Sequence, residues 1–218
     1  GRASAALLIA RVLTALRRDY SFRLVTLAGG AKYNAITREA SAELVLADSV
    51  STSAFREAVR AEETVLRNEY AGTDPSLSFT TKVVDSGAAA LTAESTEKVL
   101  GLMEALPYGV QRMSADIEGL VETSVNLGIT ELSAETFTLK YSVRSSVATA
   151  FRAVVDKIEF VASCFGASSA VHSEYPAWEY VRESAFRDEA AAIYRELFGK
   201  ELSVQAIHAG LECGILSG

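Results

Sequence analysis

Residues 121–129 read VETSVNLGI, and residues 136–146 read TFTLKYSVRSS. In both stretches apolar side chains alternate with polar ones, and an alternation with a period of two predicts strands that bury one face. Residues 131–135 lie between the two stretches and are predicted to form a turn. The sequence therefore predicts an antiparallel hairpin with an apolar face against a core and a polar face toward solvent or a ligand.

The polar face of this hairpin carries charged and amide side chains. With a turn centred near Ser133, Asn126 faces Lys140 and Glu122 faces Arg144. Opposite charges on neighbouring strands attract each other, and an exposed pair of this kind contributes about 0.2–1 kcal/mol. The alternation alone therefore favours a solvated face with a Glu122–Arg144 ion pair, and a ligand-binding face is the alternative.

The composition limits the class of protein. The 218 residues are 49% apolar and 22% charged, as in globular proteins, and they suffice for one large domain or two smaller ones. The net charge of −7 with dispersed Lys and Arg argues against nucleic acid or a membrane surface as partner. No signal peptide and no apolar run of about 18 residues is present. Two cysteines suit a reducing cytoplasm, and the lack of an initiator Met suggests that the chain begins inside a longer protein.

Helix and strand patterns occur in two similar series. The first series is predicted from helical periodicity, capping residues and alternation. It consists of a helix over 5–18, strands over 21–28 and 42–46, a helix from about 53 with Thr52 or Ser53 as cap, and a strand over 77–84. The second series is a helix over 93–106 capped by Thr92, the hairpin, a helix over 151–165 and a strand over 167–174. We expect an α+β fold, a duplicated helix–strand–strand–helix–strand (ferredoxin-like) two-layer sandwich with antiparallel sheets and helices on one face. The two halves are about 1–85 and 86–178.

The tail, residues 179–218, departs from this order. It is predicted to contain a helix from Ala185 to Phe198 that ends at Gly199, and then a short strand over 202–207. We expect this segment to be a fragment of a second domain.

The sequence contains no complete catalytic constellation. The only histidines are His172 and His208, and there is neither a phosphate-binding loop nor a nucleophile elbow. His208 with Glu212 and Cys213 is a conceivable ligand set, but a loop histidine beside glycines is typical of a local hydrogen-bonding residue. The residues therefore predict no catalytic group, no metal ligand and no bound cofactor in this chain.

Five short motifs resemble those of one enzyme family. They are Gly29-Gly30 with Asn34-Ala35-Ile36 and Arg38-Glu39-Ala40, residues 121–128, Val143-Arg144-Ser145-Ser146, Tyr175-Pro176-Ala177-Trp178, and residues 207–215. In the same order they are similar to signatures of the aminoacyl-histidine (Xaa-His) dipeptidases, carnosinase-like co-catalytic zinc exopeptidases. The resemblance covers nearly the whole chain. Thr37 stands where the family usually has proline.

The resemblance implies a lid, or dimerisation, domain over 1–178, followed by a remnant of the catalytic domain over 179–218. It implies a cytoplasmic parent enzyme that hydrolyses Xaa-His dipeptides, is a homodimer, and holds two zinc ions and its general base outside these 218 residues. Arg144 matches the lid arginine that grips the substrate carboxylate, a task for which a guanidinium fork is suited. Asn126 is expected to donate to the substrate, and Gly210 and Glu212 match a loop that lines the catalytic side of the cleft.

The predicted function is therefore the lid of a metal-dependent dipeptidase, with no activity in the isolated chain. The alternative is a stand-alone duplicated α+β module for assembly or ligand sensing.

Overall fold

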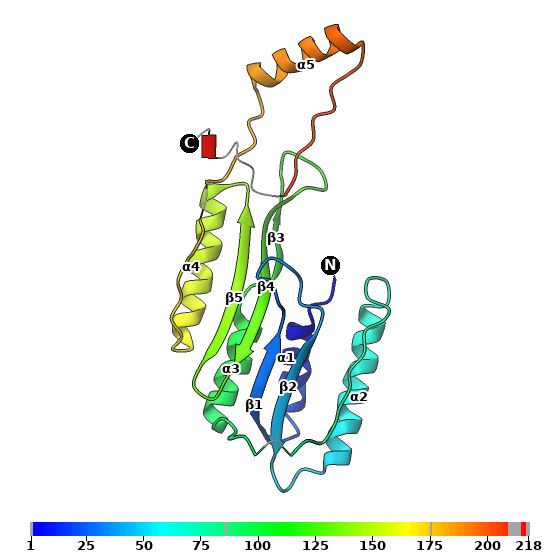
Figure 1. Ribbon diagram of the computed structural model, residues 1–218, viewed down its shortest axis with the longest axis vertical. Helices are drawn as coiled ribbons and strands as arrows, with labels where there is room; N and C mark the ends of the chain where they lie inside the picture. Colours follow the sequence, from blue (N-terminus) through cyan, green and yellow to red (C-terminus); the bar gives the residue numbers. More distant parts are fainter. Residues whose placement is uncertain (1, 86, 175, 209–214, 217–218) are drawn as a thin grey trace. The chain divides into compact units, whose positions relative to one another are not determined.

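A computed structural model describes residues 2–85, 87–174, 176–208 and 215–216 of the chain (Figure 1). The helices and strands are α1 (Ala5–Leu16), β1 (Phe22–Gly29), β2 (Ala40–Leu46), α2 (Thr52–Glu69), α3 (Ala93–Ala105), β3 (Gly109–Met113), β4 (Val121–Leu132), β5 (Phe137–Ser145), α4 (Ala148–Cys164) and α5 (Ala185–Phe198). The strands are hydrogen-bonded in the order β2-β1-β4-β3, and β5 also pairs with β4. The expected α+β class with an antiparallel sheet and helices is confirmed.

The chain divides into two compact units. Unit 1 comprises residues 1–109, 126–142 and 158–169, and unit 2 comprises residues 110–125, 143–157 and 170–218. Within the described residues, no helix has both the length and the apolar character needed to cross a bilayer.

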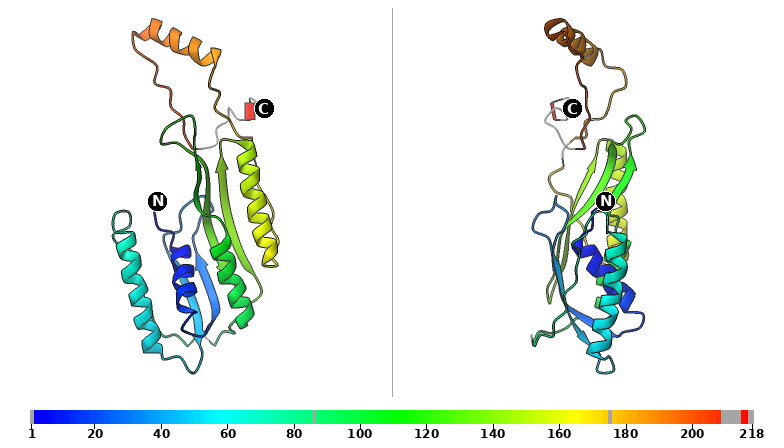
Figure 2. Two further views of the ribbon diagram at one scale, coloured as in Figure 1. Left: turned by 180° about the vertical axis from the view of Figure 1, so that it is seen from behind. Right: turned by 90° about the vertical axis from the view of Figure 1, so that its right-hand side faces the viewer.

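Unit 1 has a sheet on one side and helices on the other. Its core is formed by apolar side chains of α1, α2, α3, β1 and β4, among which Leu24, Leu27, Leu66, Leu100 and Leu127 are fully buried. Helix α1 contacts α2, α3, β1 and β2, and the edge-on view shows α1 and α2 on the same side of β1 and β2 (Figure 2). Burial of a leucine side chain contributes about 1.5–3 kcal/mol, so this apolar layer is what holds the helices on the strands.

The apolar face predicted for the second hairpin strand packs on this core. Phe137, Leu139 and Tyr141 of β5 lie against it, whereas Thr138 and Lys140 between them are exposed. On the neighbouring strand pair, β1 and β4 run antiparallel with Leu27 opposite Leu132. The alternation in the sequence thus predicted the buried face of β5 correctly.

The boundaries of several elements were predicted from local signals. Thr92 caps α3 by accepting a hydrogen bond from the Ser95 N–H, as expected. Helix α5 spans the predicted residues and ends at Gly199, whose φ of 64° is left-handed. For α2 the predicted cap was wrong by a residue, because the side chain that accepts the Ala54 N–H belongs to Ser51.

The predicted strand over 77–84 is absent among the described residues. Side chains of α2 bind the backbone of this segment instead of a neighbouring strand: the Glu63 carboxylate accepts from the Phe79 N–H at 3.2 Å, and the Arg56 guanidinium donates to the Thr81 carbonyl at 2.7 Å. Backbone N–H and C=O groups need hydrogen-bond partners. Because side chains of α2 supply these partners here, the groups are not available for hydrogen bonds to another strand. The segment has no regular secondary structure and is not part of the sheet.

The predicted strands over 167–174 and 202–207 are also wrong for the part of the chain that the structure describes, since both segments are irregular. Nearly all of their side chains are exposed, so no buried face holds them in a sheet. The strand β3 was missed because its sequence, GVQRM, has exposed residues from Val110 onward and lacks the alternation that marks a half-buried strand. The final strand of each predicted repeat is therefore missing, and the duplicated ferredoxin-like order stays a prediction.

Candidate functional site

The hairpin is paired in a different register from the one predicted. Its turn is closed by the Ser133 N–H, which donates to the Thr136 carbonyl at 2.8 Å. Farther along, the Ser146 N–H donates to the Glu122 carbonyl at 3.1 Å. The predicted Glu122–Arg144 pair is therefore wrong. A turn with Ala134 and Glu135 at its centre shifts every opposing position relative to a turn centred on Ser133.

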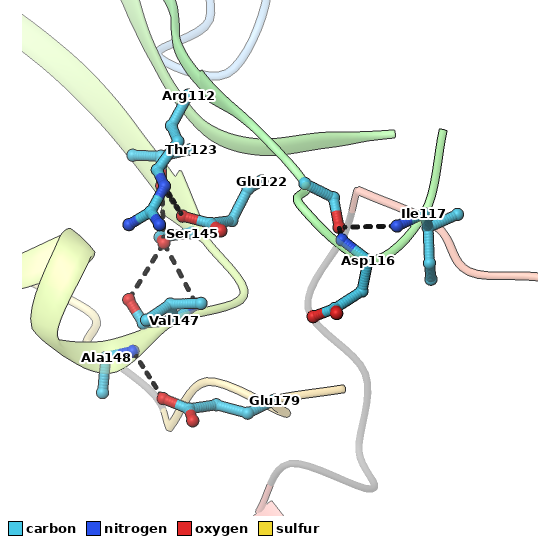
Figure 3. A network of polar contacts seen from close by, with 10 residues as sticks. Arg112, Asp116, Ile117, Glu122, Thr123, Ser145, Val147, Ala148 and Glu179 are labelled. Atoms are coloured by element: carbon cyan, nitrogen blue, oxygen red, sulfur yellow. Dashed lines mark hydrogen bonds and ion pairs between the residues drawn. The ribbon is translucent and has the colours of Figure 1, made fainter. Parts of the chain in front are cut away.

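The carboxylate of Glu122 is buried and pairs with β3. Its side chain is only 8% exposed, and its Oε1 lies 3.3 Å from Nε of Arg112, whose own side chain remains largely exposed (Figure 3). The hydroxyl of Thr123 also donates to Oε1, at 3.3 Å. A buried carboxylate loses its contacts with water, and partners of this kind offset that cost. Because Glu122 is engaged by β3, it does not neutralise Arg144.

A hydroxyl network joins the same strands to the start of α4. Ser145 Oγ lies 2.8 Å from Thr123 Oγ1 and donates to the Val147 carbonyl at 2.9 Å, and it accepts from the Val147 N–H. Next to it, the Glu179 carboxylate accepts from the Ala148 N–H at 2.9 Å, at the positive end of the helix (Figure 3). These bonds fix the end of β5 on which Arg144 lies.

Arg144 is half-buried and has no protein partner among the described residues. Every other arginine of unit 2 is engaged: Arg112, Arg152, Arg182 and Arg195 form ion pairs with carboxylates, and Arg187 donates to two backbone carbonyls. No hydrogen bond or ion pair of the Arg144 guanidinium to a described residue is found, although Arg144 is less exposed than the four arginines that form ion pairs. A guanidinium in this position keeps its five N–H donors for another molecule or for residues beyond the described ones.

His208 and Arg144 both belong to unit 2, and the charge of Arg144 acts on the imidazole of His208. Its Nε2 is 2.7 Å from Ser124 Oγ on β4, so the histidine does form a hydrogen bond, but with a distant residue and not with the local one that was expected. Burial of the ring and the positive charge of Arg144 lower the pKa of His208, and a hydrogen bond to the Val121 backbone opposes this shift. The sequence could not name Ser124 as its partner, because 84 residues separate the two.

Asn126 holds a loop of unit 1. Its Nδ2 donates to the carbonyls of Tyr33 and Ala35, at 3.1 and 3.0 Å. These two bonds use both of its N–H donors. The predicted position of Asn126 opposite Lys140 depended on a turn centred at Ser133 and is lost with that register. The loop over 31–36 is exposed, and its backbone passes so close to Gly128 that a Cβ there would lie 2.2 Å from the Tyr33 oxygen.

Two of the predicted site residues, Gly210 and Glu212, lie outside the described residues. In the part of the chain that the structure describes, no group of three or more His, Cys, Asp and Glu side chains is arranged to hold a metal ion. The described residues therefore do not fit a zinc site, and the candidate site is a cationic, hydrogen-bonding one formed by Arg144, His208 and Ser124.

Known proteins match this chain over almost its whole length. The cytosol non-specific dipeptidase of Escherichia coli (strain K12) is 32% identical over 216 residues, which are 99% of this chain and 44% of that protein. The crystal structure of aminoacylhistidine dipeptidase from Vibrio alginolyticus has a TM-score of 0.92 and 28% identity, and the match covers 100% of this chain and 44% of that one. The resemblance to these dipeptidases is confirmed. No protein-family model matches the chain, which spans less than half the length of the dipeptidases that it matches.

Proposed function

We propose that this chain is the lid region of a dipeptidase for Xaa-His dipeptides, and that Arg144 grips the free carboxylate of the substrate. The observation that carries the proposal concerns Arg144, a half-buried residue whose guanidinium has no partner among the described residues. Every other arginine of unit 2 is engaged. The two dipeptidases that match the chain support the class of substrate.

Arg144 suits a carboxylate for physical reasons. A guanidinium presents two parallel N–H donors to the two oxygens of a carboxylate, and such charge-assisted bonds are about twice as strong as neutral ones. Partial burial strengthens the attraction, because less water screens the charges. A lysine at this position would supply the charge without the planar fork.

Asn126 contributes to the proposed lid through the 31–36 loop. Both of its N–H groups hold backbone carbonyls of that loop, so donation to a substrate would require the release of one of them. The carboxamide oxygen of Asn126 is the group that could accept from a ligand. Gly210 and Glu212 remain proposed contributors to the substrate cleft.

The hydrolytic step belongs to the parent enzyme in this proposal. The parent is a cytoplasmic homodimer with two zinc ions, held by residues outside these 218, and a metal-activated water is the chemistry that zinc supplies. The word cytosol in the name of the Escherichia coli relative supports the location. The boundary between the lid and a catalytic-domain remnant near residue 178 is part of the same proposal.

Kinetics of the complete gene product test the role of Arg144. Loss of one partner of a buried charge pair costs about 2–5 kcal/mol, so Arg144→Ala should lower kcat/KM on a Xaa-His dipeptide about 30- to 5,000-fold. Arg144→Lys should recover only part of this loss, because its ammonium lacks the fork.

Arg152→Ala is the matched control, since Arg152 lies on α4 of the same unit and forms an exposed i,i+4 pair with Asp156. Its kcat/KM should stay within about twofold of the wild type, as for other exposed pairs. An Arg144→Ala enzyme as active as the Arg152→Ala enzyme would remove Arg144 from the site. A complete gene product without dipeptidase activity would instead favour a binding or assembly module.

A further inference from the structure

The hydrogen bonds of His208 assign its neutral tautomer. Nε2 faces Ser124 Oγ at 2.7 Å, which leaves Nδ1 for the hydrogen bond to the Val121 backbone. A backbone carbonyl only accepts, so Nδ1 carries the proton and Nε2 accepts from the Ser124 hydroxyl. In the neutral state the hydroxyl hydrogen of Ser124 is therefore used by the imidazole.

Protonation of His208 reverses the bond to Ser124. Both ring nitrogens of an imidazolium donate, so Nε2–H then donates to Ser124 Oγ, and the hydroxyl hydrogen of Ser124 becomes free to donate elsewhere. A hydroxyl fits both states because it is a donor and an acceptor. When His208 is protonated, the Ser124 hydroxyl is therefore available to donate to a ligand. When His208 is neutral, that hydroxyl donates to the imidazole instead.

The charges around His208 oppose its protonation while the site is empty. Arg144 on β5 is the described cation that acts on the ring, and the contacts from β4 are the neutral Ser124 and the Val121 backbone. Glu122, the nearest carboxylate along β4, is engaged by Arg112 at 3.3 Å. A carboxylate bound to Arg144 would neutralise the guanidinium and add a negative charge, which reverses the sign of the local field.

We propose that His208 and Ser124 complete the carboxylate site of Arg144, and that a carboxylate binds there together with one proton, which His208 takes up from solvent. This inference rests on the proposed function of Arg144 and extends it. The bound state carries an Arg144 fork, an imidazolium and a free Ser124 hydroxyl. Because the bound state holds one more proton, the affinity is highest at pH values below the pKa of His208 in the ligand-free chain. It falls as the pH rises from that value to the pKa of His208 in the complex, and it is lowest above the latter.

The two histidines of the chain make the test direct. Imidazole signals of the 218-residue chain are followed by NMR against pH, without ligand, with acetate, and with acetamide as the neutral probe of the same shape. His172 is exposed and serves as the internal control, and His172→Gln assigns the two signals. The pKa of His208 should rise by about one unit in acetate, as for an opposite charge within about 4–6 Å, and should not change in acetamide.

Two variants separate the parts of the site. Arg144→Gln should raise the pKa of His208 in the absence of ligand and abolish its response to acetate. Ser124→Ala should leave Arg144 in place, reduce the binding of acetate, and remove the coupling of the hydroxyl to the imidazole. His172 should respond to neither substitution.

The outcomes distinguish the two levels of the proposal. Acetate that binds at Arg144 without a change in the His208 pKa overturns the coupled proton while the proposed function of Arg144 stands. Acetate that perturbs neither residue, even at high concentration, overturns the carboxylate site and with it the proposed function. A His208 response that is the same in wild type and Arg144→Gln assigns the anion to a different cation and also overturns the inference.

Discussion

Gly128→Ala is expected to destabilise the fold by pushing the 31–36 loop away from β4. A Cβ on residue 128 would lie 2.2 Å from the Tyr33 oxygen and 2.4 Å from its carbonyl carbon and Cα. All three are backbone atoms, so no change of side-chain rotamer relieves the overlap. Gly30 adds to the constraint, because its φ of 81° is left-handed and a Cβ there would lie 1.8 Å from the Gly128 oxygen.

The magnitude follows from overpacking and from the bonds that the loop would lose. Forcing an extra carbon into a packed region costs about 1–3 kcal/mol. Displacement of Tyr33 and Ala35 also lengthens the two Asn126 bonds of 3.1 and 3.0 Å, each worth about 0.5–1.5 kcal/mol. We expect a loss of about 2–4 kcal/mol in the free energy of unfolding, given partial relaxation of the exposed loop.

Urea unfolding followed by circular dichroism measures this loss. Gly72→Ala is the control, because nothing lies within 4 Å of a Cβ at that position. Its free energy of unfolding should stay within about 0.5 kcal/mol of the wild type, as at other surface positions. A Gly128→Ala chain as stable as the Gly72→Ala chain would refute the close packing of the loop on β4.

Three further substitutions test the packing and the ends of elements. Thr96→Val leaves the buried N–H of Leu24 without its acceptor at 3.1 Å and should lower the free energy of unfolding in urea by about 1–3 kcal/mol. Thr64→Val, on the exposed face of α2, is the control and should be nearly neutral. Equal stabilities of the two variants would contradict the hydrogen bond from Leu24 to Thr96. Gly199→Ala places a Cβ in a left-handed residue at the end of α5 and should cost about 1 kcal/mol, measured as faster amide hydrogen exchange in that helix. Burial raises the pKa of Tyr141 above its ordinary value of 10.0, so at alkaline pH only the unfolded state ionises, and stability falls as the pH rises above about 10. Tyr141→Phe removes a hydroxyl that has no partner among the described residues and should weaken this alkaline loss without lowering stability at neutral pH; an unchanged pH profile would argue against the burial of that ring.

The parts of the fold that the sequence predicted depend on local signals. The cap of α3 at Thr92 and the end of α5 at Gly199 each require only residues within a turn or so of the boundary. The buried face of β5 follows from the alternation of three side chains. Such patterns act over a few residues, so they can be read without knowing what the segment packs against.

The errors in the fold arise from partners that are distant in the chain. Residues 77–84 have the apolar character of a strand, but Glu63 and Arg56 of α2 bind their backbone groups. Nothing in the local sequence distinguishes this arrangement from a sheet edge. The predicted register of the hairpin rested on placing the centre of the turn at Ser133. The hydrogen bond that closes the turn runs from the Ser133 N–H to the Thr136 carbonyl, so the centre lies after Ser133.

The candidate site was predictable only in its residue types. Motif resemblance singled out Arg144, but its lack of a partner depends on β3 engaging Glu122, which the sequence did not indicate. Asn126 was expected to face Lys140, whereas its partners Tyr33 and Ala35 lie 93 and 91 positions away. Contacts over such separations are set by tertiary packing and not by periodicity.

The most direct test of the central claim compares two substrates in two enzymes. The complete gene product and its Arg144→Ala variant are each assayed on a Xaa-His dipeptide and on the same dipeptide with an amidated C-terminus. If Arg144 binds the carboxylate, the wild type should prefer the free dipeptide by about 30-fold or more in kcat/KM, and the variant should lose most of this preference because its activity on the amide changes little. An unchanged preference for the free carboxylate in the Arg144→Ala enzyme would contradict the account.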